Sequence, residues 1–173
     1  MPAARRPAEL KWFGRAAAVE PLDSTFGGVM REAKKILVPV NGNPTDAAML
    51  ALAAQTAKRT KARVYAIHVI EVRRNLPLDA DLVEEREAAN QILDNAERIA
   101  EEWGQRIETE ILQARDIGTA IVEEAIEAQA DLILLGVSYR RKFGEFDLGK
   151  TVPYVLKHAP CEVWVCREPI PSK

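Results

Sequence analysis

Cysteine, histidine and aromatic residues are scarce in this 173-residue sequence, which has two cysteines, two histidines and an aromatic content of 6%. Cys161 and Cys166 lie five residues apart in one expected strand. Their side chains should therefore point to opposite faces, and a disulfide between them is not expected. Neither cysteine has metal-ligand spacing around it, so we interpret both as reduced structural cysteines and expect no metal.

The sequence also lacks an excess of charge of either sign, with a formal net charge of −2. Nucleic-acid binding needs a basic surface, and the run Arg140-Arg141-Lys142 is too short to supply one. No window approaches the apolar length of a membrane span, and the N-terminus has no uninterrupted apolar stretch typical of a signal peptide. We expect a cytoplasmic protein that binds no nucleic acid and spans no membrane.

From Lys35 onward, apolar runs alternate with segments of helical period. The runs are continuous rather than alternating, which indicates strands buried on both faces of a parallel sheet. The pattern predicts an α/β fold: a doubly wound five-stranded parallel sheet with helices on both faces. The expected strands are 35–40, 63–72, 108–114, 131–136 and 162–166. The expected helices begin at Asn43-Pro44 and span 81–103, 119–129 and 151–158.

Helix-end signals and apolar spacing refine these helices. Asn43 resembles an N-cap followed by proline at the first helical position, and Gly104 fits a C-terminal stop. The expected inward faces include Trp103 in the second helix and Ile126 in the third.

Two loops follow strands conspicuously, residues 41–43 and 136–149. In open α/β sheets ligands bind beyond the carboxyl ends of the strands, where the strand order reverses. If both loops serve one site, the first and fourth strands are neighbours, which gives the order 3-2-1-4-5.

The second loop contains a match to the P-loop pattern, GEFDLGKT at residues 144–151. A P-loop leaves its strand directly, whereas seven residues separate Gly136 from Gly144, and only one expected strand follows. We therefore interpret the match as accidental. Gly149-Lys150-Thr151 still precedes a short helix, whose free amides attract anions, and Arg140 can add charge.

The stretch KKILVPVNGNPTDAAMLALAAQTAKRTKARVYAIHVIEV resembles the opening of universal stress protein domains. ADLILLG, the loop after it and VLKHAPCEVWVCR resemble their closing half. The resemblance covers residues 34–167 and implies the sheet order 3-2-1-4-5, an adenine-nucleotide pocket and a homodimer formed by the last strands. In this sequence those dimer residues are Glu162, Val163, Trp164 and Val165.

Family members that bind ATP resemble one another in a loop written G-x2-G-x9-G-[ST]. Its first glycine falls on Gly136 and its third on Gly149. The second glycine position is occupied by Tyr139, the serine or threonine position by Lys150, and Thr151 follows one step later.

These departures change what the loop can do. The bulky Tyr139 disfavours the positive-φ turn that glycine allows. Asn41 replaces the first-strand aspartate of the family; it can still hydrogen-bond a purine edge or ribose, without the charge. Lys150 can contact phosphate directly, whereas Glu145 and Asp147 oppose an anion unless they face solvent.

We therefore predict a cytoplasmic universal-stress-type sensor or regulator that binds ATP, AMP or cyclic AMP. It is not expected to be an enzyme, because no nucleophile–base–orienter set can be connected, and any ATP hydrolysis would be slow and incidental. The expected nucleotide-contacting residues are Pro39, Val40, Asn41, Val69, Leu135, Gly136, Ser138, Tyr139, Arg140, Gly149, Lys150, Thr151 and Val152.

Two alternatives stay open. The first is a nucleotide-free protein-interaction module that regulates a partner such as a membrane transporter. The second is an electron-transfer-flavoprotein-like or synthetase-like enzyme, which shares the fold class. We divide the chain into an N-terminal extension at 1–33, the domain at 34–168 and a tail at 169–173. Residues 1–34, with Trp12 and Phe13 as anchors, are a candidate docking or dimer-strapping segment.

Overall fold

A five-stranded parallel sheet forms the centre of the protein in a computed structural model that describes residues 33–139, 141–142 and 145–169. The strand order is β3-β2-β1-β4-β7, which confirms the predicted 3-2-1-4-5 topology. Trp12, Phe13 and the rest of the predicted extension up to residue 32 lie outside the described residues, as does Arg140. The strands are β1 (Lys35–Pro39), β2 (Arg63–Glu71), β3 (Ile107–Ala114), β4 (Leu132–Val137) and β7 (Glu162–Arg167).

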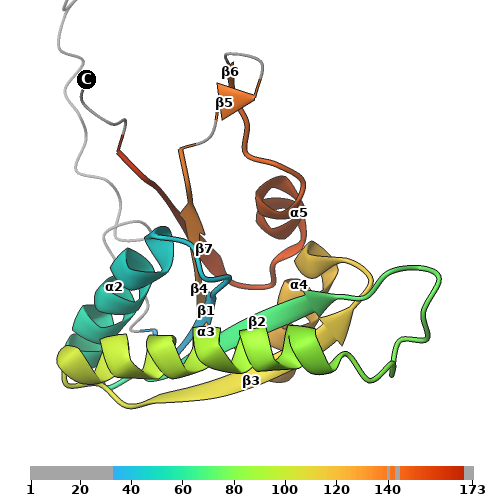
Figure 1. The fold of residues 1–173 in the computed structure, drawn as a ribbon. Helices are drawn as coiled ribbons and strands as arrows, with labels where there is room; N and C mark the ends of the chain where they lie inside the picture. The colour runs from blue at the N-terminus through green and yellow to red at the C-terminus, as the bar shows by residue number, and fades with distance from the viewer. Residues whose placement is uncertain (1–32, 140, 143–144, 170–173) are drawn as a thin grey trace, which may run out of the picture. The chain divides into compact units, whose positions relative to one another are not determined.

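Helices cover both faces of this sheet (Figure 1). Helices α2 (Thr45–Thr60) and α3 (Val83–Glu102) pack on one face, and α4 (Ile117–Glu127) and α5 (Thr151–His158) on the other. Among the described residues, no helix combines the length and apolar content needed to cross a membrane.

The two-sided packing explains the continuous apolar runs in the sequence. Successive side chains of a strand point to opposite faces of the sheet. Ile36 and Val38 therefore pack with α2 and α3, while Leu37 between them packs with α4 and α5. All three side chains are fully buried.

Local hydrogen bonds lie at the ends of two helices. Helix α2 has Pro44 as its cap residue and begins at Thr45, one residue later than predicted. The Asn43 side-chain oxygen accepts a hydrogen bond from the Thr45 amide over 2.8 Å, just before the helix. Gly104 has φ +69° and donates its amide hydrogen to the Glu101 carbonyl over 2.7 Å, which ends α3.

Several details differ from the sequence-based expectations, and α3 begins at Val83, two residues later than predicted. Helix α4 begins two residues earlier, at Ile117, because Asp116 caps it. Trp103, expected to face inward, is 42% exposed, since it is the C-cap residue where the chain leaves α3. Ile126 is 58% exposed, because it lies about 100° further round α4 than the buried Ala125.

The loop after β4 contains a feature that the sequence did not predict. Strands β5 (Arg141–Lys142) and β6 (Glu145–Phe146) pair as a small antiparallel hairpin. In Figure 1 this hairpin lies beyond the end of β4, on the side of the sheet where α5 begins.

Candidate functional site

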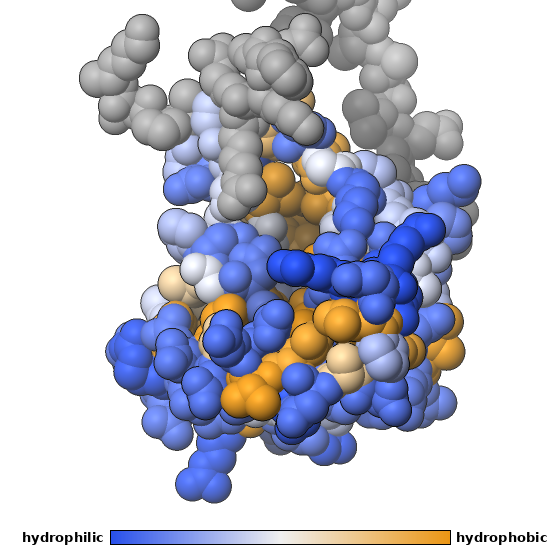
Figure 2. Space-filling model, turned by 45° about the vertical axis from the view of Figure 1, so that its right-hand side comes forward, coloured by the Kyte–Doolittle hydropathy of each residue, from blue (hydrophilic) through white to orange (hydrophobic). Residues whose placement is uncertain are grey.

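A cavity of about 650 Å³ lies at the carboxyl ends of β1 and β4. Its size is in the range typical of small-molecule sites. Most of its wall is aliphatic, and Figure 2 shows a hollow of this character, with apolar groups inside and hydrophilic side chains around it. Ten predicted site residues line the cavity: Pro39, Val40, Asn41, Val69, Leu135, Gly136, Ser138, Gly149, Thr151 and Val152.

Tyr139 is a predicted site residue that does not line the cavity. Its ring stacks on Phe146 of the hairpin, with 5.8 Å between centroids, and the Arg167 guanidinium lies 5.2 Å from the Tyr139 ring. The Tyr139 amide donates to Glu168 Oε2 over 3.2 Å. Tyr139 therefore joins the hairpin to the end of β7. It also avoids the positive φ that a glycine at this position would permit.

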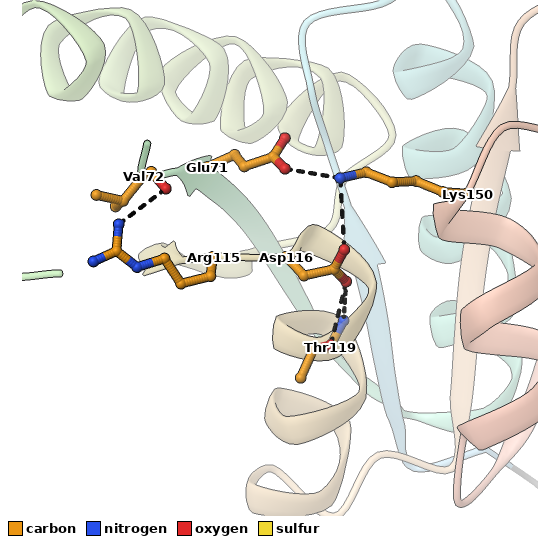
Figure 3. A network of polar contacts seen from close by, with 6 residues as sticks. All are labelled: Glu71, Val72, Arg115, Asp116, Thr119 and Lys150. Atoms are coloured by element: carbon orange, nitrogen blue, oxygen red, sulfur yellow. Dashed lines mark hydrogen bonds and ion pairs between the residues drawn. The ribbon is translucent and has the colours of Figure 1, made fainter. Parts of the chain in front are cut away.

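Lys150 also lies outside the cavity wall, in contacts with two carboxylates (Figure 3). Its Nζ atom is 2.8 Å from Glu71 Oε1 at the end of β2 and 3.6 Å from Asp116 Oδ2 at the start of α4. The hydrogen bond to Glu71 is the main reason that the pKa of Lys150 is raised. This lysine therefore connects the start of α5 to two neighbouring elements.

Asp116 is held by its own helix as well as by Lys150. Its Oδ1 atom accepts a hydrogen bond from the Thr119 amide over 3.0 Å. This bond is the largest contribution to lowering the pKa of Asp116, and the Lys150 charge lowers it further. Beside it, the Arg115 guanidinium donates to the Val72 carbonyl, which holds the chain that leaves β2.

Asp46 is a buried carboxylate near the cavity that the sequence analysis did not select. It lies in the first turn of α2, is 8% exposed, and accepts hydrogen bonds from the amides of Asn41 (2.9 Å) and Gly42 (2.7 Å). Burial raises the pKa of Asp46, and these backbone bonds oppose the rise. An aspartate one turn after a strand-end Asn-Gly pair is the sequence signal that could have indicated it.

Gly136 has a packing role that the loop pattern did not reveal. A Cβ atom at this position would lie 2.9 Å from the Cβ atom of Thr45 and 3.0 Å from Cγ of Met49. Glycine therefore lets the first turns of α2 approach β4 closely, which places both carboxyl-end loops at one cavity.

Ser138 contributes an enclosed hydroxyl to the cavity wall. Its Oγ atom has no hydrogen-bond partner within the described part of the chain. A buried hydroxyl without a partner is costly in free energy, so a polar ligand group that bonds to it would be favoured.

Asp147 lies in the loop just before α5, whose first helical residue is Thr151. Its Oδ1 atom accepts a hydrogen bond from the Gly149 amide over 2.9 Å, and both residues line the cavity. Gly149 has φ +68°, a conformation that favours glycine. Over residues 33–139, 141–142 and 145–169, no three histidine, cysteine or acidic side chains cluster as a metal site.

Comparison with known proteins identifies the family of this fold. The profile of the universal stress protein family matches residues 32–167. The chain belongs to this family. Over 142 residues, it is 34% identical to a universal stress protein of Methanocaldococcus jannaschii, an alignment that covers 79% of this chain and 83% of the relative.

Two solved universal stress proteins share the fold. One, from Archaeoglobus fulgidus, was solved in complex with dAMP; it has a TM-score of 0.62 and 22% identity, with 76% of this chain and 95% of that chain covered. The other was solved in complex with cAMP, with a TM-score of 0.60, 20% identity and coverage of 78% and 97%.

Proposed function

We propose that this universal stress protein binds an adenine nucleotide in the cavity at the carboxyl ends of β1 and β4. The observation that carries the proposal is the cavity itself, with aliphatic walls and one enclosed hydroxyl that lacks a partner. The two relatives of the same fold that were solved with dAMP and cAMP support this ligand class.

The cavity wall suggests how such a ligand would lie. Val40, Val69 and Leu135 provide apolar surface against which a purine ring could pack. The Ser138 hydroxyl would bond a polar group of the base or ribose. The phosphate end would lie near Thr151, because the free amides at a helix start attract anions.

We propose that the protein acts as a cytoplasmic sensor or regulator rather than as a catalyst. Asp147 is the only ionisable side chain among the described residues that line the cavity, and it is hydrogen-bonded to Gly149. A hydrolase would need a base positioned to activate its nucleophile. An aliphatic site with one engaged carboxylate is better suited to binding and release.

We assign this function to residues 34–168, with 1–33 as an N-terminal extension and 169–173 as a tail, and we propose that residues 1–34 dock a partner. We also propose a homodimer formed through the edge strand β7, in which Glu162, Val163, Trp164 and Val165 meet a second copy. Strand β7 lies at one edge of the sheet, so one side of its backbone is available for pairing.

The test is direct identification of the ligand. Purified protein is heat-denatured, and the released small molecules are analysed by mass spectrometry. The emptied protein is refolded and titrated with adenosine, AMP, cAMP and ATP in a calorimeter. We expect an adenine compound in the supernatant or a saturable heat signal with at least one of the four. The absence of both contradicts the proposal.

A pair of variants tests where the phosphate lies. Gly149→Asp adds a carboxylate two residues before the first residue of α5, where a Cβ atom would meet no neighbour within 4 Å. Because like charges repel, we expect AMP affinity to fall by roughly tenfold or more while adenosine affinity is retained. Gly149→Asn has nearly the same shape without the charge and is the control. An unchanged AMP affinity in Gly149→Asp would show that the phosphate lies elsewhere.

A further inference from the structure

We propose that Asp147 restricts the cavity to adenine ligands with at most one phosphate group, and so selects adenosine, cAMP or AMP against ATP. The inference rests on the proposed nucleotide site and names the ligand class that this site accepts. It is drawn from the position of one carboxylate, which lies in the cavity wall just before the start of α5.

The first step is the position of the carboxylate. A helix start presents backbone amides that lack intrahelical partners, and phosphate groups commonly bind there. In this chain α5 begins at Thr151, and the Asp147 carboxylate is held just before it, where it accepts the Gly149 amide hydrogen over 2.9 Å. A phosphate chain extended toward α5 would therefore lie close to this carboxylate.

The second step is charge. Each phosphate added to a nucleotide brings roughly one more negative charge. The Asp147 carboxylate lies 2.9 Å from the Gly149 amide and forms part of the cavity wall. Repulsion between the carboxylate and the ligand therefore grows with phosphate number, whereas an uncharged nucleoside is unaffected.

The third step is the engagement of Lys150. Its Nζ atom lies 2.8 Å from Glu71 and 3.6 Å from Asp116, outside the cavity wall (Figure 3). A polyphosphate would have to draw this ammonium away from two carboxylates. Lys150, at the serine or threonine position of the loop, thus bonds to the framework of the site, and Asp147 places its charge in the cavity wall at an exposed position.

The rest of the described cavity wall is uncharged and does not repel the nucleoside part of a ligand. The aliphatic walls and the Ser138 hydroxyl without a protein partner suit a base and a sugar. The site is therefore complementary to the nucleoside end of the ligand and repels an extended polyanionic end.

The experiment compares the intact chain with Asp147→Asn, because asparagine keeps a side-chain oxygen that can accept the Gly149 amide hydrogen. Dissociation constants for adenosine, AMP and ATP are measured by calorimetry, once in EDTA and once with Mg²⁺. Asp94→Asn, at an exposed position on α3, makes the same change in net charge and is the control.

We expect the intact chain to bind ATP at least roughly tenfold more weakly than AMP, and Asp147→Asn to reduce that ratio by roughly tenfold. The adenosine affinity of Asp147→Asn should stay within about twofold of that of the intact chain. Asp94→Asn should leave the ratio of the ATP and AMP dissociation constants unchanged.

Two results overturn the inference while the proposed function stands. One is ATP bound as tightly as AMP by the intact chain, or a ratio that Asp147→Asn does not change. The other is a loss of ATP affinity in Asp147→Asn only with Mg²⁺, which would make Asp147 a ligand of the nucleotide-bound metal. Failure of adenosine, AMP and ATP all to bind overturns the inference together with the proposed function.

Discussion

At the scale of single residues, two aspartate carboxylates accept hydrogen bonds from backbone amides near the cavity. Asp46 accepts the Asn41 and Gly42 amides after β1, and Asp147 accepts the Gly149 amide before α5. The first carboxylate is buried and has a raised pKa, whereas the second lies in an exposed loop. Asp46 therefore serves the fold, and Asp147 can affect a ligand.

Gly136 is the residue whose replacement should disturb the fold most directly. In Gly136→Ala, the new methyl group would lie 2.9 Å from the Cβ atom of Thr45 and 3.0 Å from Cγ of Met49, so α2 must shift from β4. Overpacking of this kind costs about 1–3 kcal/mol. We expect that loss in the free energy of unfolding, measured by urea denaturation.

The control for this change is Gly149→Ala. Nothing lies within 4 Å of a Cβ atom at Gly149, so alanine there adds only the strain of φ +68°. Such strain is about 1–2 kcal/mol. If Gly136→Ala unfolds at the same urea concentration as the intact chain, the close approach of α2 to β4 does not depend on this glycine.

The site residues that could be predicted from the sequence are those whose position follows from the strand order of the sheet. Once β1 and β4 are neighbours, the chain after each strand must meet the other, so Asn41 and Gly136 converge. The directions of long polar side chains do not follow from topology. Lys150 bonds to Glu71, 79 residues away in the chain, and no local pattern indicates such a pair.

At the scale of elements, three segments meet at the Lys150 ion pairs: the end of β2, the start of α4 and the start of α5. Asp116 takes part twice, as the cap of α4 and as a partner of Lys150. A substitution that separates the two roles can show which one stabilises the fold.

We predict that Asp116→Ala destabilises the protein by about 1 kcal/mol, because the Thr119 amide loses its capping acceptor. Asp116→Asn keeps a side-chain oxygen for that amide. Its loss should be a few tenths of a kcal/mol at most, since the ion pair with Lys150 is exposed and screened by water. Urea denaturation at pH 7 measures both. Equal losses in the free energy of unfolding for the two variants would show that the capping hydrogen bond is not the main stabilising role of Asp116.

The lowered pKa of Asp116 makes the contribution of this carboxylate to the stability of the fold depend on pH. Because the folded state lowers this pKa below its ordinary value of 3.8, the carboxylate stabilises the fold fully above that value. The contribution is lost as the pH falls through the lower pKa of the folded state. The stability difference between the intact chain and Asp116→Asn should therefore shrink when the pH is lowered below 3.8. A difference that is the same at pH 6 and well below pH 3.8 would contradict this assignment.

Most elements could be predicted because apolar runs and helical periods extend over whole strands and helices. The predicted helix 151–158 matches α5 at both ends. Helix α4 was placed two residues late because Asp116 was not recognised as its cap. The hairpin of β5 and β6 could not be predicted, since two-residue strands carry no period and Phe146 packs on Tyr139, outside the pattern of either strand.

At the scale of the whole molecule, helices cover both faces of the sheet in the part of the chain that the structure describes, and β3 and β7 form its two edges. On β7, Val163, Trp164 and Val165 are only half-buried within one chain. An edge strand with half-buried apolar side chains is a template for pairing with another strand.

We predict that the protein is a dimer through β7, with a sedimentation mass of twice the 19.2 kDa chain. Val165→Lys should convert it to a monomer, because a charged side chain at a paired edge opposes strand addition. Leu112→Lys on β3 is the matched control, since Leu112 is also half-buried, lies on the other edge strand and packs against the same core as Val165. Sedimentation equilibrium gives the masses, and circular dichroism checks that both variants are folded. An intact chain that sediments as a monomer, or a folded Val165→Lys that stays dimeric, contradicts the β7 interface. Dissociation by both lysines would show that the effect is not specific to β7.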